Sequence, residues 1–207
     1  MALDYEQQYY SKKVQFIVGC DEAGRGCLLG SVFAGAVILP KDFKCDLIDD
    51  SKKLTAKKRE EAYQIIVENA IAWGVGFCTA QEIDEMNIYN ASRVAMERAI
   101  KNMNHQYDMI LTDAMKMKNC DTPWEAIIHG DAKSQCIAAA SIIAKVSRDR
   151  ECVELDKQYP QYGIAKHKGY GTKEHLEALK KYGPIKNLYR FTYAPVRACL
   201  IEKISLF

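Results

Sequence analysis

The order of strand-like segments in the first 113 residues most limits the folds open to this chain. Residues 15–20 (QFIVGC) and 31–39 (SVFAGAVIL) alternate β-branched and apolar side chains, with a glycine-rich stretch between them. A third such segment covers residues 72–79 (AWGVGFCT), and a short apolar run at 109–113 (MILTD) follows a helical pattern. Strands that first follow one another directly and then alternate with helices predict an α/β fold, a mixed sheet covered by helices.

Helical periodicity marks two long regions of the chain. Residues 57–70 carry one such pattern, and an alanine-rich run extends from Ala132 to about Tyr159. No strand pattern is recognisable past Ala132. The last third of the chain is therefore expected to be entirely helical.

The C-terminal part contains a helix whose limits the sequence marks. Thr172 is placed to cap the segment KEHLEALKKY, and the pair Gly183-Pro184 should end it. A chain of 207 residues can bury one sizeable core. We therefore expect a single domain over residues 1–207, with residues 160–207 as its helical C-terminal extension.

The composition excludes several classes of protein. Apolar residues make up 48% of the chain and charged residues 27%, as in an ordinary folded domain. The first ten residues lack the features of a secretory signal, and no apolar stretch reaches the roughly 18 residues of a membrane span. The eight cysteines lie far apart without a C-x-x-C pair, which favours reduced, mostly buried thiols over disulfides or a zinc site. We expect a cytoplasmic protein.

Charge is distributed unevenly along the chain. The formal net charge is +2, but the segment from Lys157 to Arg190 holds eight Lys or Arg residues against two acids, which gives +6. A basic segment on a nearly neutral protein indicates either a site for a polyanion or an ordinary solvated face.

Four acids stand at notable places in the predicted elements. Asp21 should end the first strand and Glu22 begin the turn, Asp113 should end the fourth strand, and Asp131 precedes the long helix. Taken singly, Asp113 could be a turn residue, Asp21 and Glu22 a solvated pair, and Asp131 only an N-cap. Gathered together, carboxylates repel one another unless cations compensate, and oxygen ligands of this kind suit Mg²⁺ or Mn²⁺. Two such ions about 3.5 to 4 Å apart typically serve phosphoryl transfer.

A glycine-rich loop follows the first two acids. It runs Gly24-Arg25-Gly26 and continues to Gly30, which misses the dinucleotide fingerprint by one position and is no Walker loop. Because glycine has no side chain, the backbone of this loop could come within hydrogen-bonding distance of a ligand.

Four stretches resemble bacterial ribonuclease HII, a ribonuclease H-like nuclease family. They are GCDEAGRG (19–26), DSKKLTAKKRE (50–60), GDAKSQCIAAASIIAKVSRDR (130–150) and YPQYGIAKHKGYGTKEHLEALKKYGP (159–184). The resemblance implies a mixed five-stranded sheet flanked by helices, with a helical C-terminal portion. It also implies an endonuclease that hydrolyses the RNA strand of RNA/DNA hybrids and cuts 5′ to ribonucleotides embedded in duplex DNA, by two-metal-ion catalysis that leaves 3′-hydroxyl and 5′-phosphate ends.

The resemblance assigns roles to individual residues. The family's catalytic, metal-binding acids, which hold Mg²⁺ or Mn²⁺, correspond here to Asp21, Glu22, Asp113 and Asp131. The loop that senses the ribose 2′-hydroxyl corresponds to Gly24, Arg25 and Gly26. Tyr170 corresponds to a tyrosine that packs on the sugar 3′ of the ribonucleotide. Lys52 and Lys53 are either phosphate contacts or surface residues. A 2′-hydroxyl is all that distinguishes RNA from DNA at one nucleotide, so a sensor beside metal-binding acids would read the sugar next to the cleaved phosphate.

Three departures from the family pattern bear on these roles. Ala114 stands where the family usually has glycine, residues 26–32 (GCLLGSV) replace a proline-containing sequence, and residues 187–196 lack a histidine-arginine-arginine pattern. Among the four acids, Asp113 is therefore supported mainly by the apolar run before it.

Two other classes of function remain open on the sequence. A catalytically inactive hybrid-binding module would share the basic segment but need not keep all four acids. A nucleotide-binding kinase or transferase could use the glycine loop, although this chain lacks a phosphate-binding lysine motif.

The end of the chain allows one more partner. Residues Lys203 to Phe207 resemble the short peptides that dock on replication sliding clamps, but a C-terminal helix that packs Leu206 and Phe207 on the core is the preferred interpretation. By analogy with the family we expect a monomer.

Overall fold

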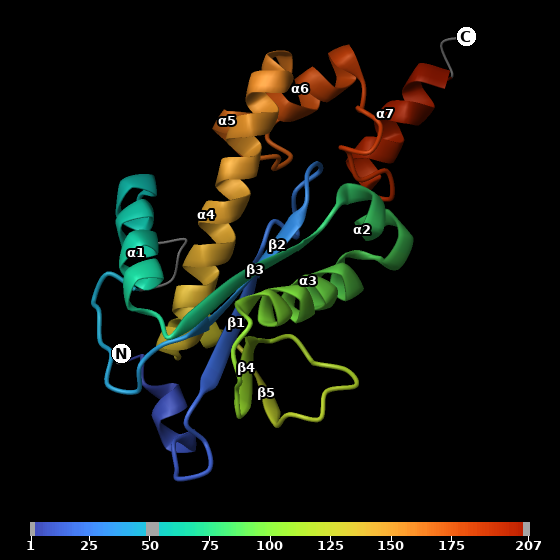
Figure 1. Ribbon diagram of the computed structural model, residues 1–207. Coiled ribbons are helices and arrows are strands. Elements are labelled where there is room, and N and C mark those ends of the chain that lie inside the picture. The colour runs from blue at the N-terminus through green and yellow to red at the C-terminus, as the bar shows by residue number, and fades with distance from the viewer. Residues whose placement is uncertain (1–2, 49–53, 205–207) are drawn as a thin grey trace.

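The computed structural model describes residues 3–48 and 54–204. Its centre is a mixed five-stranded sheet in the order β3-β2-β1-β4-β5 (Figure 1). The strands are β1 Ile17–Ala23, β2 Val32–Ile38, β3 Ala72–Cys78, β4 Met109–Asp113 and β5 Trp124–Ile127. β1, β2 and β3 form an antiparallel meander, whereas β4 pairs parallel to β1 and β5 parallel to β4. The predicted mixed sheet is confirmed.

Helices cover both faces of the sheet. The α-helices are α1 Ala56–Asn69, α2 Ala80–Met86, α3 Ile88–Met103, α4 Gln135–Gln158, α5 Ile164–His167, α6 Lys173–Tyr182 and α7 Ala194–Ile204, and the short 3-10 helices are η1 Tyr5–Tyr9, η2 Gly130–Ala132 and η3 Pro160–Tyr162. α3 lies on one face, and α4 with α1 on the other, while α5, α6 and α7 gather beyond one end of the sheet (Figure 1). The helical C-terminal part is confirmed.

β1 differs from its predicted extent in a way that matters for the acids. The antiparallel ladder with β2 continues through Asp21↔Gly35 and Glu22↔Ala34 to Ala23, so neither acid lies in a turn. Successive side chains of a strand point to opposite faces. Asp21 therefore faces α4, whereas Glu22 projects to the other side. The expectation that the strand ends at Asp21 is wrong because β2 is long enough to pair beyond it.

Two features of the C-terminal half were not visible as patterns. β5 has only four residues, and Trp124, Glu125 and Ala126 are half-buried, so no alternation marks it. The expectation of an entirely helical last third is also wrong, since residues 183–193 lie between α6 and α7 and make the backbone bridge Leu29↔Tyr189.

Two glycines let α4 pack closely on the sheet. A Cβ at Gly19 of β1 would lie 2.2 Å from the backbone carbonyl carbon of Cys136, and a Cβ at Gly35 of β2 would lie 2.3 Å from the carbonyl oxygen of Ala140. Neither contact is possible for a side-chain carbon. The glycines thus bring the first turns of α4 against the two strands, directly beneath the side chain of Asp21.

The N-terminus of α4 is capped by two side chains. Ser134, the N-cap, accepts a hydrogen bond from the Ile137 amide. The buried carboxylate of Glu6 in η1 accepts from the amides of Gln135 and Cys136 at 3.1 to 3.2 Å. A carboxylate at this end of a helix satisfies its free amides and interacts favourably with its dipole. These contacts fix where α4 begins and hence where the preceding η2 turn lies.

The other helix and thiol expectations are also met. Thr172 caps α6 and Gly183 follows its last residue, as predicted. All eight cysteines are free thiols, and six of them are buried. None of the helices in the described part of the chain combines the length and apolar character needed to cross a membrane.

Candidate metal centre

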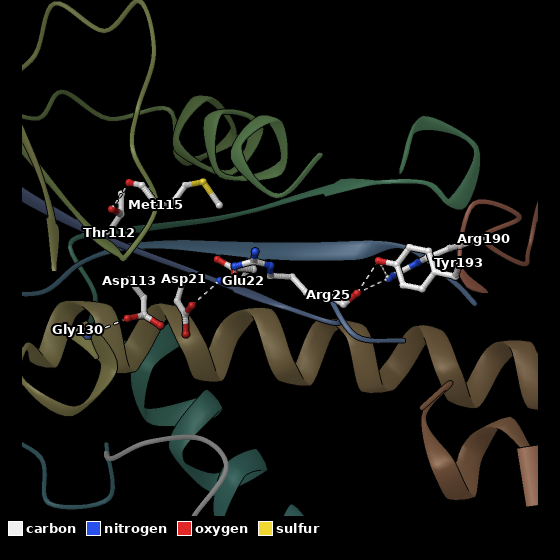
Figure 2. Close-up of polar contacts among 9 residues, drawn as sticks. All are labelled: Asp21, Glu22, Arg25, Thr112, Asp113, Met115, Gly130, Arg190 and Tyr193. Atoms are coloured by element: carbon white, nitrogen blue, oxygen red, sulfur yellow. Dashed lines mark hydrogen bonds and ion pairs between the residues drawn. The ribbon is translucent and has the colours of Figure 1, made fainter. Parts of the chain in front are cut away.

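Three carboxylates meet near the C-terminal ends of β1 and β4, two neighbouring strands in the interior of the sheet. β1 and β4 are parallel neighbours in which Cys20 pairs with Thr112, so Asp21 and Asp113 lie side by side. Asp131 reaches them from η2, just before α4. One carboxylate oxygen from each of the three lies within 4.8 Å of the others. Figure 2 shows the carboxylates of Asp21 and Asp113 pointing toward one another.

A backbone contact ties the turn that bears Asp131 to β4. The Gly130 amide donates to Asp113 Oδ1 at 2.8 Å (Figure 2). A Cβ at Gly130 would lie 2.7 Å from Cδ1 of Ile137, so a larger residue here would displace the end of that side chain. The N-cap of α4 is Ser134, three residues further on, and the alternative that Asp131 serves only as an N-cap does not hold.

Asp21 is buried among other acids. The amide of Glu22 donates to Asp21 Oδ1 at 2.7 Å, and Ser141 on α4 also hydrogen-bonds the carboxylate. Burial raises the pKa of Asp21 well above its ordinary value, and the neighbouring charges of Glu22 and Asp113 raise it further. A carboxylate in this position resists ionisation unless a cation offsets the charge. The cluster is thus electrostatically suited to a divalent cation.

Glu22 lies beside the three aspartates rather than among them. Its Oε1 atom forms an ion pair with Arg25 Nη1 at 3.0 Å (Figure 2). Its Oε2 atom is buried and has no hydrogen-bond partner among the described residues. Burial raises the pKa of Glu22, although Arg25 opposes the shift. A buried carboxylate oxygen without a partner is costly, and a bound cation would satisfy it.

A cavity of about 220 Å³ joins these acids to the glycine loop. Its lining includes Asp21, Glu22 and Asp113, the loop Gly24–Gly26, and three residues from the C-terminal half of the chain: Ser141, Lys145 and Tyr170. The ring of Tyr170 is 44% exposed. A Cβ at Gly26 would lie 4.0 Å from Tyr170 Cε1, so this ring faces the loop across the cavity.

The sequence analysis did not identify Ser141 and Lys145. Both project from α4, one turn apart, and Lys145 Nζ lies 2.7 Å from Asp149 Oδ1 and 6.0 Å from the centroid of the Tyr170 ring. The available signal was two polar residues four apart in an otherwise alanine- and isoleucine-rich helix. That spacing places both on one side of the helix.

Two of the predicted substrate-binding residues and the end of the predicted clamp-binding tail are not part of the described chain. Lys52 and Lys53 fall outside the described residues, as does the end of the tail at 205–207. In the basic segment most lysines are exposed, but Arg190 is fully buried. The solvated-face interpretation therefore fails for Arg190.

Ala114 adopts the conformation for which glycine is suited. Its φ is +53°, in the left-handed region, and its amide donates to the Ile127 carbonyl at 3.0 Å. The departure from the family pattern thus leaves the turn after Asp113 intact at the expense of backbone strain.

Comparison with known proteins gives a consistent result. The sequence model of the family Ribonuclease HII matches residues 18–196. Ribonuclease HII of Alkaliphilus metalliredigens is 53% identical over 88% of this chain and 92% of its own length, and that of Geobacillus thermodenitrificans is 51% identical over 95% and 75%. Among solved structures, ribonuclease H2 of Pyrococcus horikoshii superimposes with a TM-score of 0.77 at 26% identity, covering 90% of this chain and 98% of its own. The ribonuclease HII found in a complex with PCNA from Archaeoglobus fulgidus superimposes with a TM-score of 0.72 at 25% identity, covering 86% of this chain and 95% of its own.

Proposed function

The chain belongs to the ribonuclease HII family of metal-dependent endonucleases that cleave RNA in RNA/DNA hybrids, and on that premise we propose how its residues divide the work. The observation that carries the proposal is the convergence of Asp21, Asp113 and Asp131, because the first two of these acids line a cavity together with the glycine loop. We assign to this site the hydrolysis of the RNA strand of hybrids and cleavage on the 5′ side of ribonucleotides embedded in duplex DNA.

The donor set fits Mg²⁺ or Mn²⁺. The three clustered groups are all carboxylates, and Glu22, which lines the cavity together with Asp21 and Asp113, offers a fourth carboxylate. Oxygen-only ligands suit these hard cations. Asp21, Glu22, Asp113 and Asp131 would hold two ions, whose chemistry is to activate a water and to stabilise the leaving oxygen, giving 3′-hydroxyl and 5′-phosphate ends.

The residues around the acids have supporting tasks. Ser141 orients the Asp21 carboxylate through its hydrogen bond, and the Gly130 amide does the same for Asp113. Arg25 holds one oxygen of Glu22 at 3.0 Å, and the other oxygen has no hydrogen-bond partner in the part of the chain that the structure describes. Preorganised carboxylates of this kind need no rearrangement when cation and substrate arrive.

Two features of the cavity suit a ribonucleotide. The loop Gly24–Gly26 can bring its backbone donors to a sugar hydroxyl, and the ring of Tyr170 faces it from the opposite wall. We propose that the loop reads the 2′-hydroxyl and that Tyr170 packs on the sugar of the next nucleotide. Lys145 lines the same cavity, and its ammonium group, which pairs with Asp149, is suited to a phosphate of the cleaved strand.

The alternatives account for less of the site. A hybrid-binding module would not require three aspartates, two of them buried, with oxygens within 4.8 Å of one another. A kinase would be expected to place a phosphate-binding loop at a helix N-terminus, whereas the glycines here follow β1 and precede β2.

The test is cleavage of a duplex that carries a single ribonucleotide. We expect purified protein to cut on the 5′ side of that nucleotide with Mg²⁺ or Mn²⁺ and to be inactive in chelator. Asp131→Asn should lower the rate by several orders of magnitude yet keep hybrid binding, since phosphate contacts form independently. The exposed Asp42→Asn is the matched control and should retain full activity. Near-normal turnover by Asp131→Asn would contradict the metal-centre assignment.

Further partners and location are part of the proposal. The archaeal relative seen with PCNA supports a sliding-clamp contact through residues 203–207, which deletion of these five residues would abolish in a direct clamp-binding assay. Lys52 and Lys53 remain proposed phosphate contacts, and a monomer remains the expected state. Eight free thiols fit a reducing, cytoplasmic environment.

A further inference from the structure

We propose that Arg190 is a positioning residue that sets the backbone of the loop Gly24–Gly26 and thereby determines how well the protein distinguishes ribose from deoxyribose. The inference rests on the proposed function, in which this loop reads the 2′-hydroxyl. Arg190 lies 166 positions from Gly24 along the chain, is fully buried, and does not line the cavity.

The guanidinium of Arg190 gathers three backbone carbonyls. Nη1 donates to the carbonyl oxygen of Gly24 at 2.8 Å. It also donates to the carbonyl oxygen of Arg25 at 2.9 Å (Figure 2). Nε and Nη2 both donate to the carbonyl of Gly30, at 3.1 and 3.0 Å. Three carbonyl oxygens that point at one place repel one another, and a planar cation with five donors offsets this repulsion. The two ends of the loop region are thus fixed to a single side chain.

The direction of these carbonyls decides where the loop presents its amides. In a trans peptide the C=O and N–H bonds point in opposite directions. Because the carbonyls of Gly24 and Arg25 face Arg190, the N–H groups of Arg25 and Gly26 point away from it. Those two amides belong to the loop that lines the cavity. They are the backbone donors able to meet a sugar hydroxyl, and Arg190 holds them in that orientation.

Tyr193 completes the arrangement from the same segment. Its hydroxyl donates to the Arg25 carbonyl at 2.7 Å and accepts from Arg190 Nη1 at 3.2 Å (Figure 2). The guanidinium carbon of Arg190 lies 5.3 Å from the centroid of the Tyr193 ring. The Arg25 carbonyl is therefore held by two donors that themselves contact each other.

The segment that carries Arg190 is itself anchored. The Arg190 amide donates to the Leu28 carbonyl at 2.9 Å, and the Gly30 amide donates to the Leu188 carbonyl at 2.9 Å. Asp84 of α2 accepts from the amides of Phe191 at 2.7 Å and Thr192 at 2.9 Å. Arg190 therefore acts from a rigid support, so its hydrogen bonds constrain the loop rather than follow it.

The experiment compares two substrates that differ by one hydroxyl group. Fluorescein-labelled duplexes, one with a single ribonucleotide and one all-DNA, are titrated with the full chain by fluorescence anisotropy in chelator, so that no cleavage occurs. Tyr193→Phe removes one donor to the loop and leaves the buried cation in place, while Arg190→Lys keeps the charge but cannot reach all three carbonyls. Tyr162→Phe is the matched control, because it deletes a buried hydroxyl that donates to the Gly183 carbonyl at 2.6 Å.

We expect wild type and Tyr162→Phe to bind the ribonucleotide duplex more tightly than the all-DNA duplex. The ratio of the affinity for the ribonucleotide duplex to that for the all-DNA duplex should fall about fivefold in Tyr193→Phe and about tenfold or more in Arg190→Lys. The affinity for the all-DNA duplex should stay unchanged. A merely structural role would lower both affinities together or lower only the melting temperature. If Tyr193→Phe keeps the full preference, or if both affinities fall equally, the positioning role is wrong. If wild type itself shows no preference, it is the proposed reading of the 2′-hydroxyl that fails, and the inference fails with it.

Discussion

Replacing Asp21 with asparagine should make the metal-free protein more stable while removing its activity. Asp21, Asp113 and Asp131 each place an oxygen within 4.8 Å of the others. Two unit charges at that distance repel by about 3.5 kcal/mol at an effective dielectric constant of 20. Partial protonation relieves some of this energy, so the free energy of unfolding should rise by about 1–3 kcal/mol in Asp21→Asn, or about 2–10 °C in melting temperature.

The pH dependence of this gain has a defined sign. Burial and the neighbouring acids raise the pKa of Asp21 above its ordinary value of 3.8. Between the ordinary pKa, which applies to the unfolded chain, and the raised pKa of the folded protein, the folded protein binds more protons than the unfolded chain. The stability of metal-free wild type therefore falls as pH rises through the raised pKa. Asparagine does not titrate. The stability difference between Asp21→Asn and wild type should therefore grow as pH rises through the raised pKa and vanish near pH 4.

The assay is thermal denaturation in chelator and in Mg²⁺ across this pH range. Mg²⁺ should stabilise wild type more than Asp21→Asn, because the cation offsets the charge that the variant lacks. Asp108→Asn is the control with the opposite sign: amides of Gln15 and Phe16 lower the pKa of Asp108, so its loss should destabilise the protein at pH 8 and less so in acid. The reasoning is refuted if Asp21→Asn is no more stable than wild type at pH 8 in chelator, or if its gain persists unchanged at pH 4.

Three further predictions concern the cavity and its surroundings. Tyr170→Ala should lower kcat/KM on a single-ribonucleotide duplex about tenfold to a hundredfold through lost ring contact, without new cleavage of all-DNA; undiminished efficiency would make Tyr170 only a turn residue. Lys145→Met should weaken hybrid binding and reduce the slope of log K against log salt by about 1, and an unchanged slope would exclude a phosphate contact. Ala114→Gly should relieve left-handed strain that outweighs the greater freedom of glycine in the unfolded chain, and so raise the free energy of unfolding by up to about 1 kcal/mol in chemical denaturation. A lower free energy of unfolding would contradict this.

Local sequence patterns were sufficient for the main elements. The alternation at residues 31–39 and 72–79 and the apolar run at 109–113 correspond to β2, β3 and β4. Thr172 and Gly183 mark the limits of α6 as expected. Such features depend on neighbours within one turn or one strand, so the physical cause is present in the sequence itself. β5 escaped detection because a strand of four residues, three of them half-buried, carries too little pattern.

The candidate acids were recognisable from the sequence, but their arrangement was not. The family resemblance pointed to Asp21, Glu22, Asp113 and Asp131, and their catalytic roles stay predictions. Only the pairing of β1 with β2 shows that Glu22 projects away from Asp21, since one further residue of strand reverses the direction of a side chain. No local pattern reveals how far a neighbouring strand extends.

Tertiary structure alone decided what surrounds those acids. Ser141 and Lys145 reach the cavity because Gly19 and Gly35 let α4 lie against β1 and β2. Arg190 belongs to a segment that looked helical and basic, yet it is buried against carbonyls of the loop at Gly24. Contacts across more than a hundred residues arise from the packing of whole elements. The sequence by itself therefore determined which strands and acids this protein has, and the packing of α4 and the C-terminal segment determined which other side chains share the site.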